Sequence, residues 1–197
     1  MNRGLAGFAA RYPLVWHVME AEGAGCATLY PAASLRARSG LPTDSANRND
    51  FQIVTLPGGA TAILRAQLMH DERLCPTLAG IFTGQPERWR DHVNQHVFFW
   101  AGEDRRDRFA AACIRLRARG AIGSGPPPVT LAFDTASLLN AHAGTAYFSR
   151  INTGSTVRGG ARVRRDEMTL RPVSNWNGER VAELAIRGSV PIESAVR

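Results

Sequence analysis

The sequence contains no lysine, so all 24 of its basic residues are arginine. A chain without lysine has no P-loop lysine, no Schiff-base lysine and no Ser-Lys dyad, which excludes the enzyme classes built on them. Phosphate recognition must therefore rely on arginine, whose guanidinium binds a phosphate through two parallel hydrogen bonds. The formal net charge of +7 favours an anionic ligand or partner such as nucleic acid.

Cysteine and long hydrophobic runs are also scarce. The three cysteines, Cys26, Cys75 and Cys113, lie far apart and form no CxxC motif. This argues against a disulfide framework or a cysteine-rich zinc site, so we expect three small buried side chains. No apolar run approaches the roughly 20 residues that cross a bilayer, and residues 1–11 are too weakly apolar for a secretory signal. The simplest prediction is a cytoplasmic protein without membrane contact.

Several signatures of common enzyme classes are absent. No GxGxxG motif follows a predicted strand, so a Rossmann nucleotide site is not supported. No GxSxG elbow is present either, which disfavours a serine hydrolase. His92 and His96 have the spacing of metal ligands on a helix, but they lack the glutamate of HExxH and an evident third ligand. We therefore expect no metal site.

The predicted secondary structure mixes short helices and short strands without regular βαβ alternation. Helices are expected over residues 3–11, 69–75, 104–119 and 134–140, with another beginning near 83–87. Strands are expected over residues 14–19, 51–56, 60–65, 97–100, 129–133, 145–151 and 180–187. This order predicts an α+β fold in a single domain spanning residues 1–197.

The last predicted strand, 180–187, carries a carboxylate in its middle. Alternate residues of a strand face opposite sides, so Ala182, Leu184 and Ile186 form an apolar face and Glu183 lies on the other. Such a glutamate faces either water at a sheet edge or the floor of a cleft. On the strand 14–19, His17 shares a face with Val15 and Met19, where a lone histidine is more often a satisfied core residue.

The histidine, an aromatic strand and the glutamate occur in an order that resembles the DarT-type ADP-ribosyltransferases. The resemblance rests on Trp16-His17-Val18-Met19, Ser34-Leu35, Val97-Phe98-Phe99-Trp100, residues 181–186 and Val190-Pro191-Ile192. An uncharacterised bacterial family of the same layout is similar at residues 94–100, Asp134-Thr135 and 151–155. The resemblance covers residues 16–192. It implies an ADP-ribosyltransferase-like split β-sandwich, in which two small mixed or antiparallel sheets are flanked by short helices.

This resemblance also implies roles around NAD as the substrate. Glu183 would be catalytic, binding the ribose 2′-hydroxyl and stabilising the oxocarbenium-like charge that forms when nicotinamide leaves. His17 would bind the adenosine ribose, Phe99 or Trp100 would wall the nicotinamide, and an arginine would bind the pyrophosphate. The implied NAD-binding positions are His17, Arg48, Arg65, Phe99, Trp100 and Asn152. Met19 and Phe99 depart from the family pattern, which has a hydroxyl residue and a tyrosine there.

The acceptor of ADP-ribose is suggested only by charge. The arginine-rich segments 104–119 and 158–165 favour DNA or RNA over a protein side chain. By analogy with the family, the protein would act as a toxin or effector with an antitoxin or immunity partner. One alternative is an inactive transferase-like module that binds a nucleotide or nucleic acid. Another is an unrelated α+β enzyme, including a metal-dependent hydrolase that uses His92 and His96. The transferase hypothesis predicts that His17 and Glu183 face one cleft.

Overall fold

The computed structural model describes the chain except residues 1, 43–47, 121–124, 155, 157–162 and 197. Most of the basic segment 158–165 therefore lies outside the described residues. The described part contains six α-helices and antiparallel sheets, which confirms the α+β class. Among the described residues, no helix is long and apolar enough to cross a membrane.

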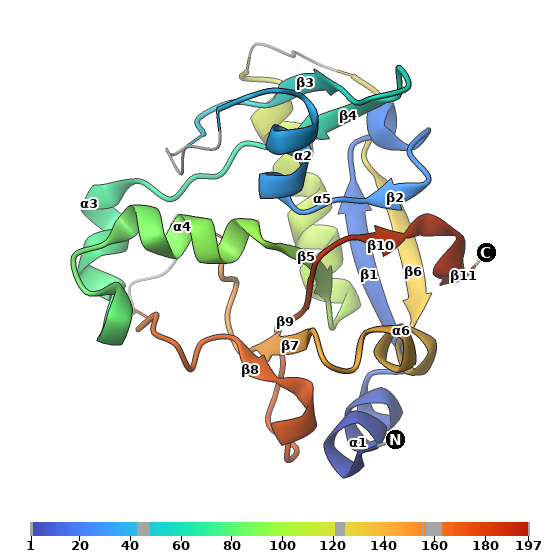
Figure 1. Ribbon diagram of the computed structural model, residues 1–197, viewed down its shortest axis with the longest axis vertical. Helices are drawn as coiled ribbons and strands as arrows, with labels where there is room; N and C mark the ends of the chain where they lie inside the picture. Colours follow the sequence, from blue (N-terminus) through green and yellow to red (C-terminus); the bar gives the residue numbers. More distant parts are fainter. Residues whose placement is uncertain (1, 43–47, 121–124, 155, 157–162, 197) are drawn as a thin grey trace.

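The strands form one seven-stranded antiparallel sheet and two two-stranded ribbons (Figure 1). The sheet order is β11-β6-β1-β5-β9-β7-β8. Its strands are β1 (Leu14–Met19), β5 (His96–Trp100), β6 (Val129–Asp134), β7 (Ala146–Ser149), β8 (Arg171–Pro172), β9 (Glu183–Arg187) and β11 (Ala195–Val196). The ribbons pair β2 (Thr28–Leu29) with β10 (Val190–Pro191), and β3 (Gln52–Thr55) with β4 (Thr61–Leu64).

The large sheet opens between β1 and β5. Strand β1 pairs with β6 along its whole length, and β5 pairs with β9 along its whole length. In contrast, β1 and β5 are in register at a single position, Trp16 opposite Trp100. Beyond it, the His17 ring bonds the Phe98 carbonyl, so a side chain links the strands where the backbone ladder has ended. The expectation of two separate small sheets is therefore corrected: the strands form one sheet that opens in the middle.

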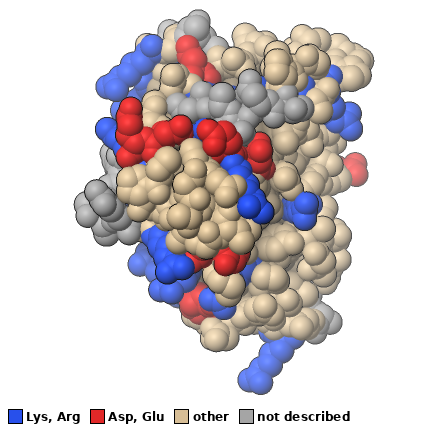
Figure 2. Space-filling view, turned by 60° about the vertical axis from the view of Figure 1, so that its left-hand side comes forward, with Lys and Arg blue, Asp and Glu red and all other residues tan. Residues whose placement is uncertain are grey.

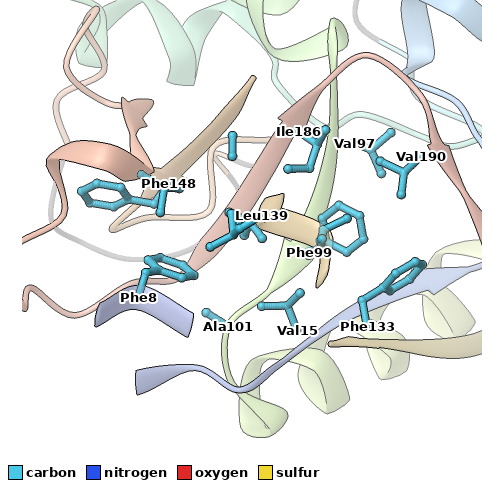
Figure 3. Close-up of a cluster of buried hydrophobic side chains, with 14 of the residues drawn as sticks. Phe8, Val15, Val97, Phe99, Ala101, Phe133, Leu139, Phe148, Ile186 and Val190 are labelled. Carbon is cyan, nitrogen blue, oxygen red and sulfur yellow. The ribbon is translucent and has the colours of Figure 1, made fainter. Parts of the chain in front are cut away.

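The main core lies on one face of this sheet (Figure 3). Helices α1 (Arg3–Arg11) and α6 (Thr135–His142) cover that face and contribute apolar side chains such as Phe8 and Leu139. Leu184 and Ile186 of β9 point into the core, as the alternating pattern predicted. Because side chains alternate along a strand, Glu183 is directed to the opposite face.

The remaining helices enclose the other face and the open end of the sheet. Helix α5 (Glu103–Arg117) packs behind β1 and β5, with Phe109 5.0 Å from the Trp100 ring. Helices α3 (Asp71–Leu74) and α4 (Pro86–Asn94) form a second core, and α2 (Ala32–Arg38) packs on the β3–β4 ribbon. Short 3-10 helices are η1 (Ala21–Gly23), η2 (Cys75–Thr77), η3 (Gly80–Phe82), η4 (Val173–Asn175) and η5 (Ile192–Ser194).

The three cysteines are free thiols in the structure. Cys26 and Cys113 are buried, as predicted, whereas Cys75 is only partly buried. Burial raises the pKa of the Cys26 and Cys113 thiols, which keeps both in the neutral form at neutral pH. Both therefore serve as apolar packing groups.

Candidate functional site

A cavity of about 260 Å³ lies where β1 and β5 separate. Residues of β1, β4, β5 and β9 line it, together with the segments 65–67 and 152–154. Apolar side chains of β1, β2, α2 and β4 form much of its wall, and polar side chains of β1, β9 and the segments 65–67 and 152–154 complete it. The volume is below the roughly 300–1,000 Å³ of sites for drug-sized ligands. The cavity is partly open to solvent, so a ligand larger than this volume can occupy it and extend beyond it.

Glu183, the first residue of β9, lines the cavity. It is only 3 % exposed and pairs across the sheet with Trp100. The backbone amide and the hydroxyl of Thr153 both donate to its Oε2, at 3.0 and 2.9 Å. Both bonds go to Oε2, and no hydrogen bond from the part of the chain that the structure describes occupies Oε1, which can therefore contact a ligand.

The pKa of Glu183 is raised from 4.5 to about 7 because burial disfavours its charged form. The two Thr153 hydrogen bonds oppose this shift, as do the positive charges of Arg105 and Arg165. A carboxyl group with this pKa exchanges protons readily near neutral pH. Glu183 is therefore suited both to stabilising a nearby positive charge and to accepting a proton.

The raised pKa predicts a pH-dependent stability difference between the wild type and Glu183→Gln. In the unfolded chain Glu183 ionises near pH 4.5, but in the folded protein it ionises only near pH 7. The folded protein therefore binds the Glu183 proton more tightly than the unfolded chain does. This raises the free energy of unfolding fully below pH 4.5, and the contribution is lost as the pH rises to about 7. We expect Glu183→Gln to gain about 2–3 kcal/mol over the wild type between pH 4.5 and 8. Denaturant unfolding at both pH values measures this; a constant difference would contradict it.

His17 lines the same cavity from β1, as the transferase hypothesis predicted. Its Nδ1 lies 2.8 Å from the carbonyl oxygen of Phe98. Because a carbonyl only accepts, Nδ1 carries the proton and Nε2 of the neutral ring is an acceptor. Burial, and then the charge of Arg65, lowers the pKa of His17 to about 4 despite the bond to Phe98. The ring is therefore neutral at physiological pH, and Nε2 can accept a hydrogen bond from a hydroxyl group.

Two aromatic side chains of β5, Phe98 and Trp100, line the cavity. Phe99 does not: it is fully buried in the main core, with its ring centroid 5.1 Å from that of Phe133. The proposed role of Phe99 as a wall of the nicotinamide site is therefore wrong. Phe99 faces the opposite side of β5 from Phe98 and Trp100, and the rings of His17 and Phe133 pack against it. Trp100, in contrast, does line the cavity, and the Phe109 ring of α5 packs against it.

Both candidate phosphate arginines line the cavity. The Arg48 Nε donates to the carbonyl of Arg65 at 3.0 Å. The Arg65 guanidinium lies 3.3 Å from Glu20 and 5.1 Å from the Phe109 ring centroid. The Arg65 side chain is 23 % exposed, whereas Arg48 is 8 % exposed as a residue, so Arg65 is the more accessible cation.

The loop before the basic segment brings Thr153 to Glu183. Asn152 lines the cavity, but its Oδ1 accepts the backbone N–H of Gly154 at 3.1 Å. This bond closes a local turn of the kind that asparagine favours. Asn152 thereby shapes the loop that presents Thr153. The sequence predicted only a polar turn at residues 152–156, so the contact of Thr153 with Glu183 was not predicted.

Of the histidine pair that suggested a metal, His96 lines the cavity and the His92 ring packs against the His96 ring. Helix α4 ends at Asn94, so His96 is the first residue of β5 and not part of a continuous helix. The His96 Nδ1 bonds the carbonyl of His92 at 2.9 Å. Within the described ranges, no group of three or more His, Cys, Asp or Glu side chains is placed to hold a metal.

Acidic and basic side chains are interleaved on the face shown in Figure 2. The same is true of α5, where Arg106 bonds Asp107 at 2.8 Å and Arg108 pairs with Asp104. Part of the arginine-rich character of this helix is therefore balanced by neighbouring carboxylates. A nucleic-acid acceptor remains a prediction from net charge.

Comparisons with known proteins give a family without an assigned activity. Searches of curated proteins and of solved structures returned no match. A family model described as a family of unknown function (DUF7002) matches residues 13–196. This range includes β1, β5 and β9, the strands that carry His17, Trp100 and Glu183. Because the match covers most of the sequence, the chain belongs to the DUF7002 family.

Proposed function

We propose that this protein is an NAD-dependent ADP-ribosyltransferase. The observation that carries the proposal is the placement of Glu183 and the neutral His17 in one cavity, at the point where the sheet opens. The opening between β1 and β5 is compatible with an ADP-ribosyltransferase-like split β-sandwich. The resemblance to DarT-type enzymes in the order of the histidine, aromatic and glutamate strands supports the same activity.

The central step is cleavage of the bond between nicotinamide and ribose C1′. Nicotinamide leaves with the bonding electron pair, and positive charge develops at C1′ and the ring oxygen. In the proposed mechanism, Glu183 Oε1 accepts the 2′-hydroxyl hydrogen bond while Thr153 holds Oε2. The ionised carboxylate stabilises the developing charge in a buried setting, where such an interaction is strong. The acceptor then bonds to C1′ and gives its proton to Glu183.

The other cavity residues would orient the dinucleotide. His17 Nε2 would accept a hydrogen bond from a hydroxyl of the adenosine ribose, and Trp100 would cover the nicotinamide and exclude water. Arg65 would bind the pyrophosphate through its accessible guanidinium. The positive charge of Arg105 near Glu183 suits an anionic acceptor, so we propose DNA or RNA. By analogy with the DarT-type enzymes, we also propose a toxin or effector role with an antitoxin or immunity partner.

The decisive test is release of nicotinamide from NAD by the purified protein, alone and with DNA or RNA. We expect release that one class of nucleic acid accelerates, together with ADP-ribose attached to that acceptor. A folded protein that releases no nicotinamide under any of these conditions would contradict the proposal.

A second candidate function is nucleotide binding without turnover. It is favoured by the Arg65–Glu20 contact at 3.3 Å, because Glu20 competes with a phosphate for that guanidinium. This alternative predicts that calorimetry detects NAD binding while nicotinamide release stays at the buffer rate.

A further inference from the structure

A buried polar network lies in the cavity at a distance from Glu183. Asn94 Oδ1 accepts hydrogen bonds from Arg48 Nη2 at 3.4 Å and from Gln67 Nε2 at 2.9 Å. All three residues are buried and all three line the cavity. Neither Asn94 nor Gln67 is used by the mechanism above.

The chemistry of arginine fixes the orientation of both amides. A guanidinium only donates, so the Asn94 atom that faces Arg48 must be the oxygen. That oxygen also faces Gln67, so Gln67 must present its amino group there. The remaining polar atoms are an acceptor, Gln67 Oε1, and a donor, Asn94 Nδ2. Their orientation follows from the hydrogen-bond network and not from a free choice of amide flip.

Gln67 Oε1 lacks a hydrogen-bond donor among the described residues. A buried acceptor without a donor is unfavourable, because it has lost its bond to water and gained nothing in return. Gln67 is 8 % exposed, so bulk water does not readily replace the missing partner. A ligand that brings an N–H group to this position would relieve the cost.

We propose that Gln67 and Asn94 recognise the hydrogen-bonding edge of an adenine base. The 6-amino group of adenine would donate to Gln67 Oε1, and an adjacent ring nitrogen would accept from Asn94 Nδ2. Asparagine and glutamine amides are the side chains that match this donor–acceptor edge. The cavity would thus select adenine nucleotides over those that carry an oxygen at position 6.

The position of the network fits the adenine end of an extended dinucleotide. On β5, His96 and Trp100 are four residues apart, about 13 Å at the usual rise of a strand, and Asn94 precedes His96 at the end of α4. Trp100 is paired with Glu183, so the two amides lie away from the reacting carbon. A nicotinamide carboxamide, which stays within a few bonds of that carbon, does not suit this place. The assignment of the two ends rests on the proposed function, whereas adenine recognition does not require turnover.

The test compares binding of NAD with that of nicotinamide hypoxanthine dinucleotide by isothermal titration calorimetry. The analogue differs only in the base, where an oxygen replaces the 6-amino group and would face Gln67 Oε1. We expect the wild type to bind NAD about 10-fold to 100-fold more tightly than the analogue. Equal affinities, or no binding of either compound, would overturn the proposal.

Two variants test whether Gln67 and Asn94 cause the preference for NAD over the analogue, and a third serves as the control. Gln67→Met removes the acceptor and should reduce the preference for NAD to less than about 3-fold. Asn94→Asp keeps an oxygen for Arg48 and Gln67 and replaces the amino donor with a second carboxylate oxygen, whose charge Arg48 can balance, so it should fold and bind NAD about 10-fold more weakly. Gln85→Met changes an exposed glutamine and should bind like the wild type.

The outcomes separate this inference from the proposed function. Wild-type discrimination that persists in both Gln67→Met and Asn94→Asp would overturn the assignment to this pair. Nicotinamide release by a protein that treats the two dinucleotides alike would refute adenine recognition and leave the transferase activity intact. Discrimination without any nicotinamide release would support the subsite and contradict the transferase.

Discussion

Replacing Glu183 with glutamine is expected to lower the rate of nicotinamide release by about 10²–10³-fold, the loss seen when one strong charge-stabilising group is removed. Glutamine keeps the shape and can still accept the Thr153 hydrogen bonds to its oxygen. It cannot carry a negative charge or accept the proton of the acceptor. The loss should therefore fall on turnover, with NAD binding changed little.

The matched control is Glu193→Gln, which makes the same chemical change at an exposed glutamate of η5. Steady-state release of nicotinamide should be unchanged in this variant. In cells, expression of the wild type should arrest growth and Glu183→Ala should relieve the arrest. Arrest that persists in Glu183→Ala, or turnover that survives in Glu183→Gln, would remove Glu183 from the mechanism.

Local sequence patterns predicted the elements that carry this site. Residues 3–11 form a helix and residues 14–19 a strand with the predicted boundaries, because Pro13 separates two segments of clear periodicity. The inward apolar face of β9 also followed from alternation, and with it the opposite direction of Glu183. These features depend on neighbours within a few residues, which the sequence displays directly.

Features that depend on distant segments were not predictable in the same way. Alternation shows that Phe98 and Phe99 face opposite sides of β5, but which side holds the cavity depends on where α1, α5 and α6 pack. Thr153 reaches Glu183 only because the loop after β7 folds back over β9. His96 continues the spacing of α4 in the sequence, yet it begins a strand that pairs with β9. Packing decides each of these positions.

A large loss of stability is expected when Arg117 is replaced by methionine. Arg117, at the end of α5, bonds Glu20 at 3.0 Å and Glu22 at 2.5 Å, and its side chain is 4 % exposed. Glu20 is 1 % exposed and Glu22 29 %. Methionine fills similar space without charge, so among the described residues the variant leaves the buried Glu20 with the 3.3 Å contact to Arg65 as its one ion pair.

Breaking one partner out of a buried ion pair typically costs about 3–5 kcal/mol, because the remaining charge is left without compensation. We expect Arg117→Met to lose stability in this range, measured by urea unfolding at pH 7. The control is Arg108→Met on the same helix, whose pair with Asp104 is exposed and should contribute at most about 1 kcal/mol. Adding Glu20→Gln to Arg117→Met should restore much of the loss, since it removes the stranded charge. Equal small effects of Arg117→Met and Arg108→Met would contradict this prediction and show that Arg65 alone stabilises the Glu20 carboxylate. The Arg65 guanidinium would then be held by Glu20 and unable to bind a phosphate.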